Sequence, residues 1–279
     1  MPNAVVSVVV PTRDRAGYLD VTLTSVLDQD FGEPYEVIVV DDGSRDSTQD
    51  VIRRHGVRSL VHEPPRGPNA ARNEGARIAE ADLIALVDDD VFAPRDWLRE
   101  FVEGARRHPD ADAYGGPIRA RLEGPAPRSC GRELPPVTTL DLGAEDREAE
   151  LVWSANMLVR RRALERAGEF DEALPTGGDE EDWLRRLTAS GGRVVYIAGA
   201  AIDHRRTGDD ARLRSLMRSA YHRGYNLRGY DSSRGVAPSV GHELRVLAGC
   251  GWHAVRRACP QGLIMGAHSA GRLMRAVGR

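Results

Sequence analysis

The chain has 279 residues, of which 41% are hydrophobic and 29% charged, the composition of an ordinary soluble globular protein. No apolar run reaches the roughly 18 residues needed to span a bilayer, and the first residues lack the basic segment of a signal peptide. Three cysteines, Cys130, Cys250 and Cys259, show no metal-ligand spacing. Their odd number predicts inert thiols in a reducing compartment, so we expect a cytoplasmic protein.

The charge is unevenly distributed along the chain. The net charge of the chain is −3. From Arg205 onward there are 14 arginines and only four acidic residues, which gives this part a charge of +10 and leaves −13 for the preceding part. All the positive charge is arginine. This asymmetry suggests an acidic catalytic part followed by a basic segment able to meet phosphates or an anionic surface.

The first hundred residues alternate between strand and helix patterns. Residues 5–10 are a β-branched run that ends at Pro11, as expected for a strand buried on both faces. This alternation predicts an α/β fold with a doubly wound, mostly parallel sheet and ligands at the carboxyl ends of its strands. Further strands are expected at residues 37–40, 58–62 and 83–87, and helices at 18–27, 46–54, 69–79 and 94–107.

The second half is less regular. Residues 121–150 are rich in Pro, Gly and charge, which predicts a long loop of the kind that shapes binding sites. Strands are expected at 152–159, 193–197 and 200–204, a helix at 179–190, and amphipathic helices thereafter. We therefore expect a catalytic domain over residues 1–206, with halves meeting near residue 118, and a basic helical extension over 207–279.

Three acidic clusters stand where predicted strands or loops end. They are Asp41-Asp42, Asp88-Asp89-Asp90 and the run from Asp179 to Asp182. Helix capping explains the third cluster equally well, since Asp favours helix starts and turns. Three consecutive Asp after an apolar strand are better explained by a hard divalent cation, which prefers carboxylate oxygens.

The segment after the first strand argues against two common kinds of nucleotide-binding site, the dinucleotide site and the P-loop. It reads Pro11-Thr12-Arg13-Asp14-Arg15 and contains neither a Gly-rich dinucleotide fingerprint nor a P-loop.

The sequence resembles family-2 glycosyltransferases of the GT-A fold over about residues 5–206. Each motif is weak alone, but all occur in the family's order and spacing. Residues 8–15 resemble the "PTYNR" start, 36–44 the second-strand motif, 67–75 the "ARNxG" helix start and 88–90 the DxD motif; residues 156–172, 178–187 and 200–204 resemble the segments around the catalytic acid and the terminal His.

The resemblance implies an enzyme that moves a sugar from a nucleotide-diphosphate sugar to an acceptor hydroxyl, with inversion and with Mn²⁺ or Mg²⁺. Carried over by position, the family's roles fall on four sets of residues. Donor contacts fall on Pro11, Thr12, Arg13, Asp41, Asp42, Asn69, Arg72, Asp88 and Asp89; metal ligands on Asp88, Asp90 and His204; acceptor contacts on Trp153, Asn156 and Trp183; the catalytic base on Glu180 or Asp179.

One departure from the family concerns the base. The usual Glu-Asp pair is Asp179-Glu180 in this chain, and Glu180 falls on the position of the catalytic Asp. The chemistry suits these residues, because a divalent ion neutralises the diphosphate leaving group and a carboxylate takes the proton of the attacking hydroxyl. Taken alone, His204 at a strand end is better explained as a hydrogen-bonded structural histidine, and the resemblance makes a metal ligand an equally good explanation.

Several alternatives stay open on the sequence. A retaining enzyme, a nucleotidyltransferase on a similar sheet, or an inactive nucleotide-binding scaffold would fit the same motifs.

Arg160–Arg162 are expected in a solvated turn, with one side chain reaching phosphates or the acceptor. The C-terminal helices either pack on the catalytic domain or lie peripherally at the inner face of a membrane, to which Arg212, Arg214 and Arg218 would contribute charge. No motif supports nucleic-acid binding.

Overall fold

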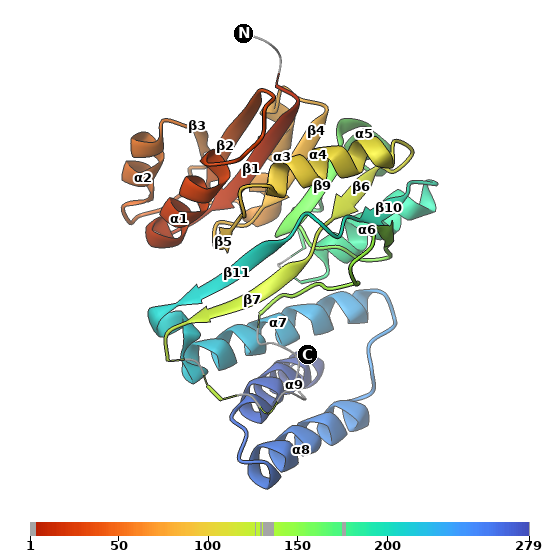
Figure 1. Ribbon diagram of the computed structural model, residues 1–279. Helices are drawn as coiled ribbons and strands as arrows, with labels where there is room; N and C mark the ends of the chain where they lie inside the picture. The colour runs from red at the N-terminus through yellow and green to blue at the C-terminus, as the bar shows by residue number, and fades with distance from the viewer. Residues whose placement is uncertain (1–3, 126, 129, 131–136, 175–176, 279) are drawn as a thin grey trace. The chain divides into compact units, whose positions relative to one another are not determined.

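A computed structural model describes residues 4–125, 127–128, 130, 137–174 and 177–278. Figure 1 shows its strands and helices. The strands are β1 (Val6–Thr12), β2 (Tyr35–Asp41), β3 (Arg58–Val61), β4 (Leu83–Val87), β5 (Val91–Phe92), β6 (Ala113–Gly115), β7 (Ile118–Glu123), β8 (Arg147–Glu148), β9 (Asn156–Arg160), β10 (Val194–Tyr196) and β11 (Ile202–Thr207). The helices are α1 (Ala16–Leu27), α2 (Thr48–His55), α3 (Pro68–Ile78), α4 (Trp97–Arg107), α5 (Arg161–Ala167), α6 (Asp179–Ala189), the 3₁₀ helix η1 (Gly208–Ala211), α7 (Leu213–Ser233), α8 (Val240–Arg256) and α9 (Gln261–Val277).

The main sheet has the strand order β3-β2-β1-β4-β9-β6-β10-β8. Strands β3, β2, β1 and β4 are mutually parallel, whereas β9 runs antiparallel to both β4 and β6. A smaller sheet has the order β5-β11-β7. The predicted α/β fold with a mostly parallel sheet is therefore confirmed, with β9 and β8 making the sheet mixed.

Strand β1 shows why a strand in the parallel part of the sheet has a continuous run of apolar residues in its sequence. Val8 and Val10 pack into one hydrophobic cluster with residues of α1 and α4, while Val9 packs into a second with residues of α3. Successive side chains of a strand point to opposite faces, and here both faces are covered. The strand prediction for this segment is thus confirmed together with its reason.

The elements of the second half differ in detail from the sequence prediction. Strand β7 enters the stretch predicted as a loop, and part of that stretch lies outside the described residues. The predicted turn at Arg160–Arg162 is wrong, because Arg160 ends β9 and the next two arginines begin α5. Their side chains are not free to reach a ligand. Arg161 donates to the carbonyls of Ala79 and Ala81, and Arg162 donates to the buried Asp112.

The chain divides into two compact units. The first contains residues 1–119, 139–173 and 179–204, and the second contains 120–138, 174–178 and 205–279. In the second unit α9 packs against both α7 and α8, with a small core formed around Leu216, Ala220 and Ile264. The buried Arg272 of α9 is paired with Glu243 of α8 and Asp231 of α7, so an ion-pair network links the three helices.

Candidate active site

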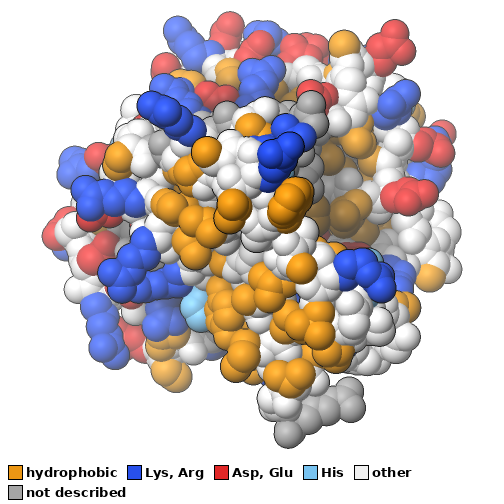
Figure 2. Space-filling model, turned by 90° about the horizontal axis from the view of Figure 1, so that it is seen from below, with side chains coloured by type: hydrophobic (Ala, Val, Ile, Leu, Met, Phe, Trp, Pro, Cys, Tyr) orange, Lys and Arg blue, Asp and Glu red, His pale blue; other side chains and the backbone are white. Residues whose placement is uncertain are grey.

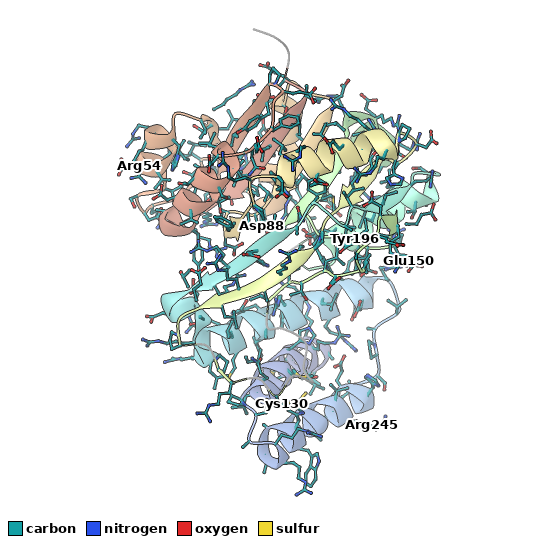
Figure 3. The ribbon with its side chains drawn as sticks, viewed as in Figure 1. Arg54, Asp88, Cys130, Glu150, Tyr196 and Arg245 are labelled. Atoms are coloured by element: carbon teal, nitrogen blue, oxygen red, sulfur yellow. The ribbon has the colours of Figure 1, made fainter. Side chains whose placement is uncertain are left out.

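The carboxyl ends of three neighbouring strands bring the predicted site residues together. Thr12, at the end of β1, lies opposite Asp41, at the end of β2. The Thr12 hydroxyl donates to the carboxylate of Asp89, which follows β4, at 2.7 Å. Figure 3 shows the neighbouring Asp88 at the lower end of β4. The acidic clusters thus meet at one edge of the sheet, as the strand order requires.

A candidate metal site lies at this edge. One carboxylate oxygen each of Asp88 and Asp90 and one imidazole nitrogen of His204 lie within 4.8 Å of one another. The imidazole is held in place by Asp90, whose Oδ1 is 3.0 Å from His204 Nε2. Asp90 and His204 are buried, whereas Asp88 is partly exposed. Two carboxylates and an imidazole are donors that suit Mn²⁺, so these residues fit the cation that the resemblance implies.

Arg15 is a site residue that the motif comparison missed. Its guanidinium is 3.1 Å from Asp89 and donates to Asp90 at 2.8 Å. Burial alone would lower the pKa of Arg15, but the two carboxylates raise it above its ordinary value. Burial, together with the neighbouring Asp90, raises the pKa of Asp89 to about 7 against the opposing effect of Arg15. Arg15 thus compensates the charge of the three consecutive Asp residues, and its place in the first motif was the available signal.

The carboxylates after β2 organise the loops around them. Asp41 is fully buried and accepts from the Ser44 backbone amide at 2.9 Å and from the Gln49 side chain. Asp42 accepts from the backbone amides of Arg66 and Gly67 at 2.7 and 2.9 Å. Burial raises the pKa of Asp42, but these amides and His62 outweigh it and hold the pKa below its usual value. The exposed Arg13 guanidinium lies 3.9 Å from Asp42.

Arg72 of α3 links the acidic cluster after β4 to the start of α6. Its guanidinium donates to Asp88 at 3.3 Å, to Asp179 at 3.1 Å and to Asn69 at 2.9 Å. Burial lowers the pKa of Arg72, but Asp88, Glu180 and Asp179 together raise it. A buried arginine with carboxylate partners fixes their positions relative to each other.

The two acidic residues at the start of α6 have different surroundings. Asp179 is buried and bound to Arg72. Glu180 is partly exposed and accepts from the Ser154 hydroxyl at 2.6 Å. Burial raises the pKa of Glu180 to about 7, assisted by Asp179 and opposed by Arg72. A carboxyl with a pKa near neutrality is suited to accept a proton.

The three residues assigned to the acceptor are placed differently from one another. Asn156 is fully buried, accepts from Trp97 and donates to the carbonyls of Pro117 and Ala200. Trp183 is also fully buried and stacks on Phe170 at 5.1 Å between ring centroids. Trp153 is partly buried against the core. Asn156 and Trp183 are therefore engaged within the protein interior, and their contact with an acceptor stays a prediction.

Comparison with known proteins decides the family. Residues 7–168 match the glycosyl transferase family 2. The chain belongs to this family. It is 34% identical over 213 residues to the pre-mycofactocin glycosyltransferase of Mycobacterium tuberculosis, an alignment that covers 72% of this chain and 43% of that protein. It is 26% identical to the glucosyl-dolichyl phosphate glucuronosyltransferase of Haloferax volcanii, over 81% of this chain and 77% of that protein.

The family-2 chain also has the GT-A fold. It superposes on a mannosyltransferase from Pyrobaculum calidifontis in complex with GDP-Man and Mn²⁺ with a TM-score of 0.68 and 17% identity. The superposition covers 99% of this chain and 88% of the other. The alignment with the mycobacterial relative spans less than half of that protein's length.

Proposed function

We propose that this chain transfers a sugar from a nucleotide-diphosphate sugar to an acceptor hydroxyl with inversion at the anomeric carbon. The observation that carries the proposal is the connection made by Arg72, which binds Asp88 of the candidate metal site and Asp179 beside the candidate base. A donor held through its diphosphate at Asp88 would thereby have its sugar directed toward Glu180. The family membership supports the same reaction.

The donor half of the site supplies binding and charge compensation. Asp88, Asp90 and His204 would hold Mn²⁺ or Mg²⁺, which supplies neutralisation of the diphosphate leaving group when bound. The Mn²⁺ and GDP-Man in the structural relative support this use of the same fold. Thr12, Arg13, Asp41 and Asp42 lie at the strand ends where a nucleotide base and ribose bind in open α/β sheets. Asp89 accepts from the Thr12 hydroxyl, Asn69 accepts from Arg72, and Pro11 precedes Thr12 in β1.

Glu180 is the base that the geometry favours. Asp179 is buried and held by Arg72, so its carboxylate is engaged within the protein. Glu180 is partly exposed, and its pKa of about 7 lets it exist as a carboxylate that still binds a proton well. It would remove the acceptor's hydroxyl proton while that oxygen attacks the anomeric carbon and the nucleoside diphosphate leaves.

An anionic membrane surface is the proposed setting of the acceptor. Leu244, Trp252 and Val255 of α8 are exposed on one helical stripe, and the exposed Arg256 and Arg257 follow them. Figure 2, a view from below, shows hydrophobic side chains gathered on the surface with Lys or Arg side chains nearby. An apolar stripe flanked by arginine is the pattern of an interfacial helix. Among the described residues, no helix is long and apolar enough to cross a membrane.

The reaction is tested with a panel of nucleoside-diphosphate sugars and Mn²⁺. We expect one donor to raise the melting temperature only with the cation, and its transfer to release a nucleoside diphosphate with inverted product stereochemistry by NMR. Release of pyrophosphate would indicate a nucleotidyltransferase, and failure to bind any donor would favour a scaffold. Asp88→Ala should lose cation-dependent donor binding while remaining folded, because its side chain is partly exposed and Arg72 keeps Asp179 and Asn69 as partners. Full activity of the wild type in excess chelator would contradict the metal assignment.

A further inference from the structure

A second cluster of metal-ligating groups lies in the C-terminal unit. Cys130, His253 and Cys259 each place one ligand atom within 4.8 Å of the other two. Cys130 Sγ lies 3.5 Å from His253 Nε2. In Figure 3, Cys130 lies beside helices α8 and α9. None of the chain's three cysteines forms a disulfide.

The three groups come from separate segments, which is why no ligand spacing is visible in the sequence. Cys130 belongs to the segment between β7 and β8, His253 lies in α8, and Cys259 lies in the turn between α8 and α9. The turn is unusual because Ala258 has a φ of 47°, a conformation that residues other than glycine rarely adopt. After that turn the Cys259 amide donates to the Ala254 carbonyl, so Cys259 lies beside the last turn of α8.

The geometry suits a tetrahedral thiophilic cation. Zn²⁺ binds thiolate sulfur at about 2.3 Å and imidazole nitrogen at about 2.0–2.1 Å, which places two such ligands of one tetrahedron about 3.5 Å apart. This separation agrees with the 3.5 Å between Cys130 and His253. The donor set also differs in kind from Asp88, Asp90 and His204, because thiolates select soft cations and carboxylates select hard ones.

We propose that Cys130, His253 and Cys259 bind Zn²⁺, with water completing the coordination. Both thiols would bind as thiolates and release their protons, and His253 would bind through its Nε2 atom. The ion would fasten the segment that carries Cys130 to the α8–α9 turn. The sequence-based expectation that all three cysteines are inert would then hold for Cys250 alone.

The test is metal binding to the full chain in reductant. Metal-free protein is titrated with Zn²⁺, and with Co²⁺ as a spectroscopic probe, in excess Mn²⁺ so that the carboxylate site is filled. We expect one Zn²⁺ per chain and a thiolate-to-cobalt charge-transfer absorption. Cys130→Ser should weaken that absorption per bound cobalt, because only the Cys259 thiolate remains. It should also lose at least roughly tenfold in Zn²⁺ affinity, because one of three protein ligands is removed. Cys130 is exposed, so this variant should remain folded.

A matched control separates ligation from the mere presence of a thiol. Cys250 is a buried cysteine of α8 outside the cluster, and Cys250→Ser should keep the wild-type stoichiometry and spectrum. Cys259→Ser should resemble Cys130→Ser, whereas His253→Ala should lose Zn²⁺ affinity but keep the absorption per bound cobalt, because both thiolates remain. The proposal is overturned if the reduced wild type takes up no Zn²⁺, or if Cys130→Ser binds it as tightly as the wild type. It is equally overturned if peptide mapping finds a Cys130–Cys259 disulfide and the reduced protein gives no cobalt–thiolate band.

Discussion

Arg72 shows how one side chain can set the geometry of the whole site. A buried guanidinium is costly unless carboxylates surround it, and removing one partner of a buried ion pair destabilises far more than an exposed pair would. Its partners Asp88 and Asp179 follow different elements, β4 and the loop before α6. The ion pairs therefore fix the candidate metal site, which contains Asp88, and the start of α6, which contains Asp179, relative to each other. No propensity or period in the sequence reveals this connection, although the arginine itself stands in a recognisable motif.

The two acidic residues that begin α6 should respond differently to neutral substitutions. Glu180→Gln keeps the shape and the Ser154 contact but removes the proposed base, so turnover should fall by about two to four orders of magnitude. Donor affinity should be unchanged. Asp179→Asn should retain more turnover but lower the melting temperature, because Arg72 loses a buried carboxylate partner. Single-turnover transfer, calorimetric donor binding and thermal unfolding measure these effects. If Asp179→Asn is inactive while Glu180→Gln turns over normally, the base is Asp179.

The pKa of Glu180 predicts a pH dependence of both activity and stability. Asp179, Arg72 and Ser154 are the groups that contact or face its carboxyl, and its pKa rises from 4.5 to about 7. As the proposed base, Glu180 must be ionised to accept a proton, so kcat/KM should rise with pH through about 7 and then level off.

The stability effect has the opposite sense. A carboxyl whose pKa is raised by folding contributes stability below pH 4.5 that is lost as the pH rises through about 7. Glu180→Gln lacks this loss, so its stability relative to the wild type should increase across that window. Urea unfolding of both proteins at pH 5 and pH 8 measures the difference, and an unchanged difference would contradict the raised pKa.

At the scale of elements, helix α3 is positioned on the sheet by a glycine. A β-carbon on Gly75 would lie 2.3 Å from Val9 of β1 and 3.2 Å from Val40 of β2. The helix backbone can approach the strands only because that atom is absent. This close approach places Arg72 and Asn69, about one and two turns earlier on α3, beside the carboxyl ends of the strands.

Gly75→Ala should therefore destabilise the fold by about 1–3 kcal/mol, the usual cost of overpacking a core. Gly17 of α1 is the matched control, since a β-carbon there meets nothing within 4 Å. Gly17 lies in the first turn of α1. Gly17→Ala should therefore be neutral or stabilise by at most roughly 0.5–1 kcal/mol, because glycine loses more conformational freedom than alanine when it enters a helix. Denaturant unfolding measures both values. Equal effects in the two variants would show that α3 does not depend on the close contact.

The fold and the site were predictable from the sequence to different extents. Strands β1, β2 and β4 were predictable because a strand buried on both faces is a continuous apolar run that ends at a polar turn. The helix α5 was missed because three consecutive arginines suggest a solvated turn, whereas Arg161 binds backbone carbonyls within the fold. The carboxylates after β2 and β4 were predictable because parallel strands end at one edge. The Cys130, His253 and Cys259 cluster was not, since its members meet only after the chain has folded.

For the whole molecule, the segregation of charge predicts how the protein meets an anionic surface. The surplus of +10 from Arg205 onward and the exposed stripe on α8 both belong to the C-terminal unit. Electrostatic attraction would bring the unit to the surface, and apolar side chains would then enter the interface. Binding to vesicles of mixed phosphatidylcholine and phosphatidylglycerol should therefore weaken with added salt and be weaker still without the anionic lipid.

The apolar stripe is tested by removing two of its side chains together. Leu244 and Val255 are 54% and 82% exposed, so the double change Leu244→Ser with Val255→Ser should leave the core intact. Each side chain contributes up to about 1.5–3 kcal/mol when fully buried, so vesicle affinity should fall by roughly tenfold or more. The matched control is Leu27→Ser with Val61→Ser, which removes two exposed apolar side chains from the first unit. Vesicle co-sedimentation measures all three proteins, and transfer to a water-soluble acceptor should be the same in each. Equal loss of binding in both double variants would show that α8 has no special part in membrane contact.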